Sequence, residues 1–241
     1  MGLRLMCVTA HPDDECFGFG GALALAADRG IETHVVCLTD GQAATNRGDA
    51  ASGEALGTMR REEFRRSCAV LGVTECELMD YQDGRLEFVE LPIAAERLVE
   101  RIRRFRPDVV MTFGGDGGQN THADHMMTSM LTTAAFHWAA QTKRYPNAGE
   151  VYRARRLYYL TADFQIPDRS PAMPMPWTVT LDIRSVRERK AEAFRQHVSQ
   201  APLMEKTKDF FAKHGAEEFY TLVAAVEPQA ARQSTDLFEG L

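Results

Sequence analysis

Short apolar runs alternate with longer amphipathic segments through residue 140, and this alternation limits the fold more than any other feature. The runs of strand length occupy residues 3–9, 33–38, 76–79 and 108–113. Segments with helical periodicity follow them, in residues 16–30, 54–71, 91–105 and 123–140. Strands separated by helices pair in parallel through right-handed crossovers. The sequence therefore predicts an α/β fold with an open, mostly parallel sheet and helices on both faces.

The pattern changes after Pro146. Residues 156–161 and 177–183 are predicted strands, separated by a proline-rich stretch in residues 167–176. A charged amphipathic helix is predicted over residues 184–198, and a loose polar tail from residue 228. No repeat or low-complexity linker divides the chain. We therefore predict one domain, residues 1–241, with its core in residues 3–200 and a smaller C-terminal extension of strands and a helix.

Composition excludes several classes of protein. The chain is 44% apolar and 26% charged, which is typical of globular domains. No apolar run approaches the roughly 20 residues of a membrane span, and charges come too early for a signal peptide, so we expect a soluble cytoplasmic protein. A net charge of −6 argues against nucleic acid as a partner. The amphipathic segments fit a core as well as an interface, so a homo-oligomer is neither indicated nor excluded.

Two polar clusters follow predicted strands. The first reads AHPDDE over residues 10–15, directly after the first strand. The second reads HADH over residues 122–125, after the strand at 108–113 and a glycine-rich loop at 114–121. Ligands of open parallel sheets bind at the carboxyl ends of the strands. We therefore expect the fold to bring these two clusters together.

Imidazoles and carboxylates in this number form the ligand set of a catalytic zinc site, which uses three side chains and leaves one position open. The absence of cysteine from both clusters argues against a structural zinc site. Spacing alone leaves open which three residues ligate. Zn²⁺ is the expected ion, and Fe²⁺ also suits such a set. Each cluster alone has a simpler interpretation as a turn or a helix start, but two clusters at one sheet edge favour a site.

These motifs resemble the LmbE-like (PIG-L) family of zinc-dependent de-N-acetylases, which have AHPDDE after the first strand and HxDH after a later one. The resemblance covers residues 3–200. Weaker signs agree with it, namely Arg60-Arg61-Glu62-Glu63, Asp83-Gly84, and HVSQ at residues 197–200. It implies a Rossmann-like α/β fold without a dinucleotide. Ala123 departs from the commoner proline, which changes the stiffness of the backbone but no ligand.

The resemblance implies that His11, Asp14 and His125 hold the metal ion. Glu15 is expected to steady His11 from behind. His197 and Gln200 belong to the HVSQ sign, and the sequence assigns them no chemistry.

The resemblance also implies the catalytic roles. Asp13 would be the general base, and His122 would stabilise the oxyanion or protonate the leaving amine. Asp124 would lie behind His122 and hold its imidazole in one tautomer. Arg60 would approach the substrate, and Asp83 would accept a hydrogen bond from a sugar hydroxyl.

The predicted function is that of a metal-dependent hydrolase that removes an acetyl group from an N-acetylglucosamine-type amino sugar or conjugate. The expected partner is thus a small-molecule amino sugar. One alternative is a metal- or carbohydrate-binding protein without catalysis. Another is a different metal-assisted hydrolase on the same scaffold.

Overall fold

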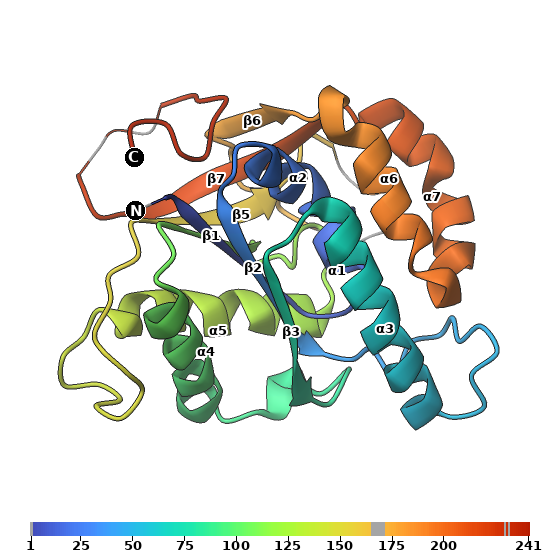
Figure 1. Ribbon diagram of the computed structural model, residues 1–241, viewed down its shortest axis with the longest axis horizontal. Coiled ribbons are helices and arrows are strands. Elements are labelled where there is room, and N and C mark those ends of the chain that lie inside the picture. Colours follow the sequence, from blue (N-terminus) through green and yellow to red (C-terminus); the bar gives the residue numbers. More distant parts are fainter. Residues whose placement is uncertain (1, 165–171, 229, 231) are drawn as a thin grey trace.

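The computed structural model describes residues 2–164, 172–228, 230 and 232–241, and its strands form one seven-stranded sheet (Figure 1). The strands are β1 (Arg4–Thr9), β2 (Glu32–Thr39), β3 (Glu75–Tyr81), β4 (Val109–Phe113), β5 (Arg156–Thr161), β6 (Val179–Asp182) and β7 (Glu217–Ala225). Their order is β3-β2-β1-β4-β5-β7-β6, in which β1 to β5 run parallel and β7 pairs antiparallel with both of its neighbours. The predicted fold class is confirmed.

Helices cover both faces of the sheet. They are α1 (Asp14–Phe17), α2 (Gly20–Asp28), α3 (Gly53–Leu71), α4 (Leu91–Phe105), α5 (Ala123–Ala139), α6 (Arg187–Arg195) and α7 (Ala201–His214), with short 3₁₀ turns η1 (Leu86–Phe88), η2 (Arg184–Val186) and η3 (Val198–Gln200). Alternate residues of β1 serve the two cores. Leu5 and Cys7 pack with residues of α2, α3 and α6, whereas Met6 and Val8 pack with residues of α4 and α5.

The sheet reverses its order between β1 and β4. From β1 the chain adds β2 and β3 on one side, and it then returns to add β4 on the other side. The carboxyl ends of β1 and β4 therefore lie next to each other, with Cys7 opposite Met111 in the register. Such a switch point is where open α/β sheets bind ligands, because the two following loops diverge there.

Several predicted bounds need correction. The helix predicted over residues 16–30 is split into α1 and α2, and the third strand extends to residues 75–81. The helix predicted over 184–198 shortens to α6 between two 3₁₀ turns. Two elements, α7 and β7, have no counterpart in the sequence-based prediction. No helix in the described part of the chain is long and apolar enough to cross a membrane.

The end of the chain is also not the loose tail that we predicted. Leu237 and Phe238 are buried in the same core as α2 and α6. The Arg156 guanidinium and the Tyr158 hydroxyl both donate to the carbonyl of Leu237 at 3.0 Å. In the proline-rich stretch, residues 167–171 lie outside the described residues.

Arg103 connects α4 to the segment between α5 and β5. Its side chain is buried, and its guanidinium donates to the backbone carbonyls of Ala139, Gln141, Arg144, Tyr145 and Gly149. The carbonyls of Ala139, Gln141 and Tyr145 also accept a backbone N–H, so Arg103 adds a second hydrogen bond to each of them. This one side chain thereby ties the end of α5 and the following loop to α4.

We expect Arg103→Met to lower the free energy of unfolding by about 2–4 kcal/mol, because methionine keeps the apolar stem but removes the buried, charge-assisted hydrogen bonds to these carbonyls. Urea denaturation measures the difference. The control is Arg104→Met, an exposed neighbour on the same helix, for which we expect a change below about 1 kcal/mol. Equal losses in the two variants would contradict this role of Arg103.

Candidate active site

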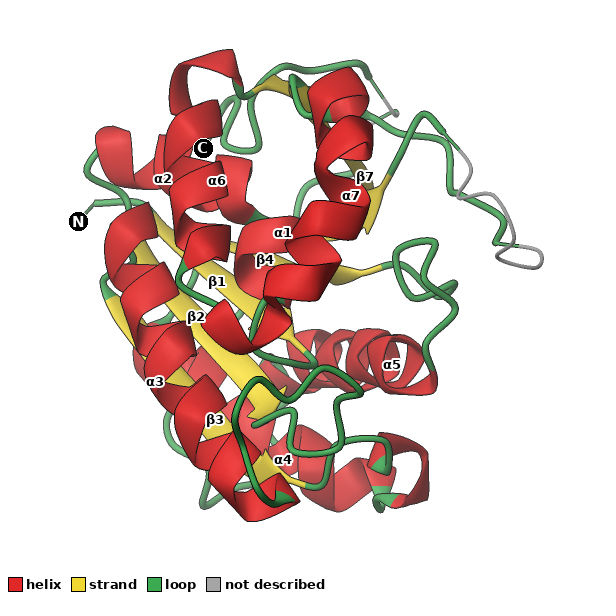
Figure 2. Cartoon of the chain, turned by 90° about the vertical axis from the view of Figure 1, so that its right-hand side faces the viewer, coloured by secondary structure: helices red, strands yellow, loops and turns green. Residues whose placement is uncertain are grey.

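A cavity of about 670 Å³ opens at the carboxyl ends of β1 and β4, which is an ordinary volume for a ligand site. The structure brings both predicted clusters into it, together with part of the loop between β2 and α3. The sequence-predicted residues that line the cavity are His11, Asp13, Asp14, Arg60, Asp83, His122 and His125. Asp124 is fully buried beside them. Figure 2 shows these loops below α1 and α7 and at the end of the strands.

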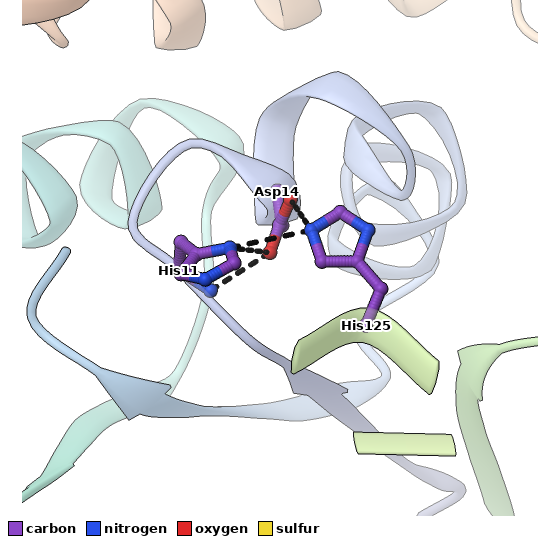
Figure 3. A group of neighbouring side chains, drawn as sticks. All are labelled: His11, Asp14 and His125. Carbon is purple, nitrogen blue, oxygen red and sulfur yellow. Dashed lines mark hydrogen bonds and ion pairs between the residues drawn. The ribbon is translucent and has the colours of Figure 1, made fainter. Parts of the chain in front are cut away.

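His11, Asp14 and His125 point toward one another (Figure 3), and one potential ligand atom from each lies within 4.8 Å of the others. His125 Nε2 is 3.2 Å from Asp14 Oδ1 and 3.3 Å from His11 Nδ1. The backbone N–H of His11 donates to the other carboxylate oxygen of Asp14 at 2.8 Å. The ring of His125 also stacks on Phe113, the last residue of β4, with centroids 4.1 Å apart. The side chains are thus held in place from outside the cluster.

The outer ring nitrogens indicate how the two histidines are protonated. His125 Nδ1 is 3.1 Å from the carbonyl of Gly117, which can only accept, so Nδ1 carries the hydrogen. His11 Nε2 lies 3.1 Å from Asp83 Oδ1 and 3.2 Å from Asp124 Oδ2. In the neutral rings, the inner nitrogens are then left with lone pairs that face Asp14. This arrangement fits a metal ion, whose histidine ligands usually donate their other N–H to an oxygen.

The charges around His11 also favour a cation. Burial acts against a charged imidazole, but the carboxylates of Asp124, Asp14 and Asp83 outweigh it and raise the pKa of His11 well above its usual value. Burial likewise opposes charge on Asp83 and Asp124, yet hydrogen bonds to His11 hold the pKa of each carboxyl below its ordinary value. The carboxylates therefore stabilise positive charge at this point, as they would that of a divalent ion.

Other groups of donors in the described residues fit a metal ion less well. These groups are His11 with His122 and Asp124, and Glu15 with Cys16 and His197. In the first group, the Asp124 carboxylate already accepts from the backbone N–H groups of Gly84 and Leu86, at 2.7 and 3.1 Å. In the second group, Glu15 is occupied by hydrogen bonds from protein donors.

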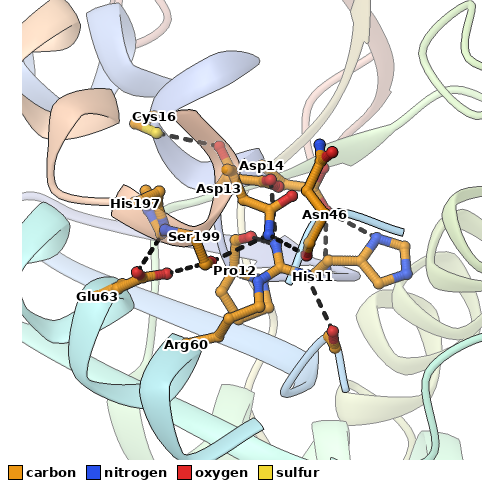
Figure 4. A network of polar contacts seen from close by, with 12 residues as sticks. His11, Pro12, Asp13, Asp14, Cys16, Asn46, Arg60, Glu63, His197 and Ser199 are labelled. Atoms are coloured by element: carbon orange, nitrogen blue, oxygen red, sulfur yellow. Dashed lines mark hydrogen bonds and ion pairs between the residues drawn. The ribbon is translucent and has the colours of Figure 1, made fainter. Parts of the chain in front are cut away.

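Asp13 has an unusual backbone conformation, with φ at 111° and ψ at −25°. A non-glycine residue there costs about 1–3 kcal/mol, so the surroundings must hold it. Its backbone N–H donates to Glu15 Oε2 at 2.9 Å. Arg60 donates to Asp13 Oδ2 at 3.1 Å and to the carbonyl of Pro12 (Figure 4). Burial raises the pKa of Asp13 to about 6, against the opposing charge of Arg60.

We predicted that Glu15 would steady His11. Its carboxylate instead holds the turn at Asp13. Its Oε1 accepts a hydrogen bond from Ser67 of α3 at 2.5 Å and lies 2.7 Å from His197 Nε2. The side chains of Glu15 and His197 are both fully buried. His197 thus belongs to the support of the site, and the HVSQ motif was the signal for it.

The rest of the HVSQ motif also reaches the site. The backbone N–H and the hydroxyl of Ser199 both donate to Glu63 of α3 at 2.7 Å (Figure 4). Gln200 lines the cavity. The C-terminal extension is therefore attached to α3 at the edge of the cavity.

Asp124 is arranged differently from our prediction. Its carboxylate contacts His11, whereas its backbone N–H donates to His122 Nδ1 at 3.2 Å. Because Nδ1 accepts this bond, Nε2 carries the hydrogen of the neutral His122 ring. Burial, followed by the charges of His11 and His125, lowers the pKa of His122. With Nδ1 occupied in this way, the neutral ring presents its Nε2–H as a donor beside the cluster.

Arg60 and Asp83 line the cavity, with part of their polar atoms already engaged. Arg60 donates to the carbonyl of Gly41 at 3.1 Å. Gly41 has φ at +67°, and a Cβ there would collide with the guanidinium, so glycine is required at this close approach. Asp83 Oδ2 accepts from the backbone N–H of Ala43 at 2.9 Å. The loop between β2 and α3 is thereby fixed over the cavity.

Comparisons with known proteins agree with the geometry. The family model described as PIG-L, GlcNAc-PI de-N-acetylase, matches residues 6–136. The mycothiol S-conjugate amidase of Streptomyces coelicolor is 35% identical over 65% of this chain, which spans only 60% of that protein. The 1D-myo-inositol 2-acetamido-2-deoxy-alpha-D-glucopyranoside deacetylase of Rhodococcus jostii is 28% identical over 99% of this chain and 98% of its own. The diacetylchitobiose deacetylase of Thermococcus kodakarensis is 31% identical over 83% of this chain and 70% of its own.

Solved structures share the fold. The N,N'-diacetylchitobiose deacetylase of Pyrococcus horikoshii matches with a TM-score of 0.75 and 22% identity, over 91% of this chain and 83% of its own. The 4-carboxy-2-hydroxymuconate hydratase of Pseudomonas putida matches with a TM-score of 0.74 and 22% identity, over 95% of this chain and 99% of its own. The names of these two proteins describe different reactions, so the fold alone does not decide the chemistry.

The Glu15–His197 pair generates a prediction on stability. Although burial opposes charge on His197, Glu15 outweighs it and raises the pKa of His197 above its usual 6.5. A raised pKa contributes stability that is fully present below 6.5 and is lost as the pH rises through the folded-state value. We expect His197→Gln to lower the free energy of unfolding by about 2–3 kcal/mol in mildly acidic solution, and by less in alkaline solution.

Urea denaturation of metal-free protein, between about pH 5 and 9, measures this difference. His137→Gln is the matched control, because His137 is an exposed histidine on α5. A gap between wild type and His197→Gln that stays constant with pH would show that the charge of His197 adds nothing.

Proposed function

Because the chain belongs to the PIG-L family, described as GlcNAc-PI de-N-acetylases, we propose that it is a metal-dependent deacetylase acting on an N-acetylglucosamine-type amino sugar or conjugate. One observation carries this proposal: the cluster of His11, Asp14 and His125 lies in the same cavity as Asp13 and His122. The names of several relatives, which describe deacetylation of such sugars, support the substrate class.

In this proposal, His11 Nδ1, Asp14 Oδ1 and His125 Nε2 hold one Zn²⁺ or Fe²⁺ ion. The convergence of their lone pairs and the surrounding carboxylates support the assignment. Such an ion acts as a Lewis acid and lowers the pKa of a water molecule. His11 and His125 keep their orientation through the oxygen acceptors behind them.

Asp13 is the proposed general base. Its carboxylate lies next in sequence to a proposed ligand and lines the cavity, and Arg60 fixes one of its oxygens. A pKa of about 6 keeps the group mostly ionised at neutral pH while leaving it basic enough to accept a proton. The turn held by Glu15 directs Asp13 and Asp14 to separate tasks, although they are adjacent in the chain.

His122 is the proposed stabiliser of the oxyanion that develops when water attacks the acetamide carbonyl. The hydrogen bond from Asp124 N–H to Nδ1 leaves the Nε2 hydrogen free to be donated to that oxygen. The lowered pKa of His122 supports the donor role over that of a charged acid. Asp124 contributes through its backbone to His122 and through its carboxylate to His11.

Arg60 and Asp83 are the proposed substrate contacts. Asp83 lies on the cavity wall beside His11 and presents a carboxylate that a sugar hydroxyl can approach. Arg60 has a second function that the sequence does not reveal, since it also holds Asp13. A change at Arg60 is therefore expected to affect both binding and catalysis.

Two alternatives remain distinct from this proposal. A protein that only binds metal has no need of a base at Asp13 or of a donor at His122, so their positions argue for catalysis. A different reaction on the same fold, such as the one named for the hydratase, would give a product other than acetate, so identifying the product distinguishes it from deacetylation. Release of acetate from an N-acetylglucosamine glycoside tests the proposal, and its absence across a panel of such conjugates with metal-loaded protein would overturn it.

We expect the purified protein to bind about one divalent ion per chain. His11→Ala, Asp14→Ala and His125→Ala should each weaken Zn²⁺ binding by more than about 100-fold, because changes behind the ligands alone cost about 10–100-fold. Metal analysis and chelator competition measure the affinity, and acetate release measures activity. His137→Ala is the control, since this histidine is exposed on α5. Full metal content in all three variants would refute the ligand assignment.

We expect Asp13→Asn and His122→Gln to retain about one ion per chain while kcat falls by about 10²–10⁴. Asparagine cannot accept the proton from water, and glutamine replaces the ring donor with a longer, less directed amide. Steady-state kinetics combined with metal analysis separates the two effects. If Asp13→Asn protein loses its metal, Asp13 is a ligand and the roles of the two aspartates must be exchanged.

A further inference from the structure

A second cavity, of about 270 Å³, adjoins the first. Its lining residues include residues of α7, the carboxyl end of β5 and the first residues of β7. The residues that line both cavities are Phe17, Gly18, Gly118, Leu160, Lys206 and Thr207. A molecule bound at the metal cluster can therefore extend along this shared boundary without leaving the protein surface.

The second cavity is lined by aromatic rings, and we call it the aromatic chamber. Its rings are those of Phe17, Phe164, Phe210, Phe211 and Phe219. The rings of Phe164 and Phe210 meet edge to face at 4.7 Å, as do those of Phe17 and Phe211. Phe210 and Phe211 follow each other on α7, their rings are in contact, and both side chains are only partly buried. Such rings favour an apolar ligand, because the contact removes apolar surface from water.

The buried charges beside the rings are already paired. Lys190 Nζ lies 2.6 Å from Glu218 Oε1, and both side chains are nearly inaccessible. Glu218 also accepts from the backbone N–H groups of Gly21 and Ala22, at 2.7 and 2.9 Å, and from the Tyr220 hydroxyl at 2.8 Å. These partners hold the pair in place at the start of α2. Lys206, Thr207, His214 and Glu217 also line the chamber beside the rings, but most of its surface is apolar.

The contrast between the two cavities points to one occupant. The first cavity offers imidazoles, carboxylates and a guanidinium, which suit an amino sugar. Most of the surface that lines the aromatic chamber is apolar, so a polar group bound there would lose hydrogen bonds to water that the protein replaces only in part, at a cost in free energy. We propose that the aromatic chamber binds an apolar alkyl or aryl aglycone of the amino sugar that is deacetylated in the first cavity. This inference rests on the proposed function and names the substrate class: amphipathic N-acetylglucosaminides.

The test compares hexyl and methyl N-acetyl-β-D-glucosaminides on metal-loaded protein, below the concentration at which the hexyl compound forms micelles. Because each buried methylene contributes up to about fourfold in binding, we expect kcat/KM to be at least about tenfold higher for the hexyl glycoside. Equal values for the two glycosides would overturn the inference while leaving the proposed function intact.

Phe210→Ala tests the chamber itself. We expect it to lower the hexyl-to-methyl ratio by about three- to tenfold and to leave kcat/KM for the methyl glycoside unchanged, because the ring lines only the second cavity. The matched control is Phe88→Ala, which removes an exposed ring outside both cavities. A ratio that Phe210→Ala leaves unchanged, or that both variants lower equally, would contradict the assignment.

Binding measured without turnover separates this inference from the proposed function. Hexyl β-D-glucoside has no acetamide, and we expect it to inhibit competitively and to bind wild type more tightly than Phe210→Ala by calorimetry. If no glycoside releases acetate, the proposed function fails. The chamber can then still be tested by binding alone, since it takes apolar groups if the hexyl compounds bind more tightly than the methyl compound and lose this preference in Phe210→Ala. Hexyl β-D-glucoside that binds without competing with the N-acetylglucosaminides would show a separate site and overturn the inference.

Discussion

The buried carboxylate of Glu15 holds the part of the molecule on which the rest of the site depends. It accepts the backbone N–H of Asp13, and Ser67 and His197 fix it from α3 and from the C-terminal extension. Without that support, a non-glycine residue has little reason to adopt the left-handed conformation of Asp13. The turn allows two adjacent aspartates to face different partners. The strain of one residue is thus stabilised by a carboxylate that never enters the cavity.

Carboxylates outnumber cationic groups around His11. His11 is surrounded by the carboxylates of Asp14, Asp83 and Asp124, and the nearby Arg60 is directed to Asp13 and to backbone carbonyls. Negative charge therefore concentrates at one point of the cavity, while the aromatic chamber beside it contains a charge pair that is already neutralised. In our proposals, the charged cavity serves the reaction and the contacts to the sugar, and the aromatic chamber serves recognition of the aglycone.

The sequence predicts those features that depend on local pattern. Buried runs such as residues 33–38 and 108–113 revealed the parallel sheet, and the rule for its carboxyl edge brought residues 10–15 and 122–125 together. It missed contacts between distant residues: Glu15 and His197 are 182 positions apart. The direction of the Asp124 carboxylate depends on the backbone at Gly84 and Leu86, which no motif encodes. α7, none of whose residues is buried, was also missed.

The position of His197 in the chain has a consequence for synthesis on the ribosome. All the proposed metal ligands precede residue 126, so a nascent chain that has reached α5 already carries them. Ser67 and Arg60 also precede that residue, whereas His197, the other partner of the Glu15 carboxylate, emerges some seventy residues later. β7, which joins β5 to β6, emerges later still. An incomplete chain can therefore gather the metal ligands and form the turn at Asp13 before His197 completes the support of Glu15. The support of the proposed base is thus completed only after the proposed metal ligands have been synthesised.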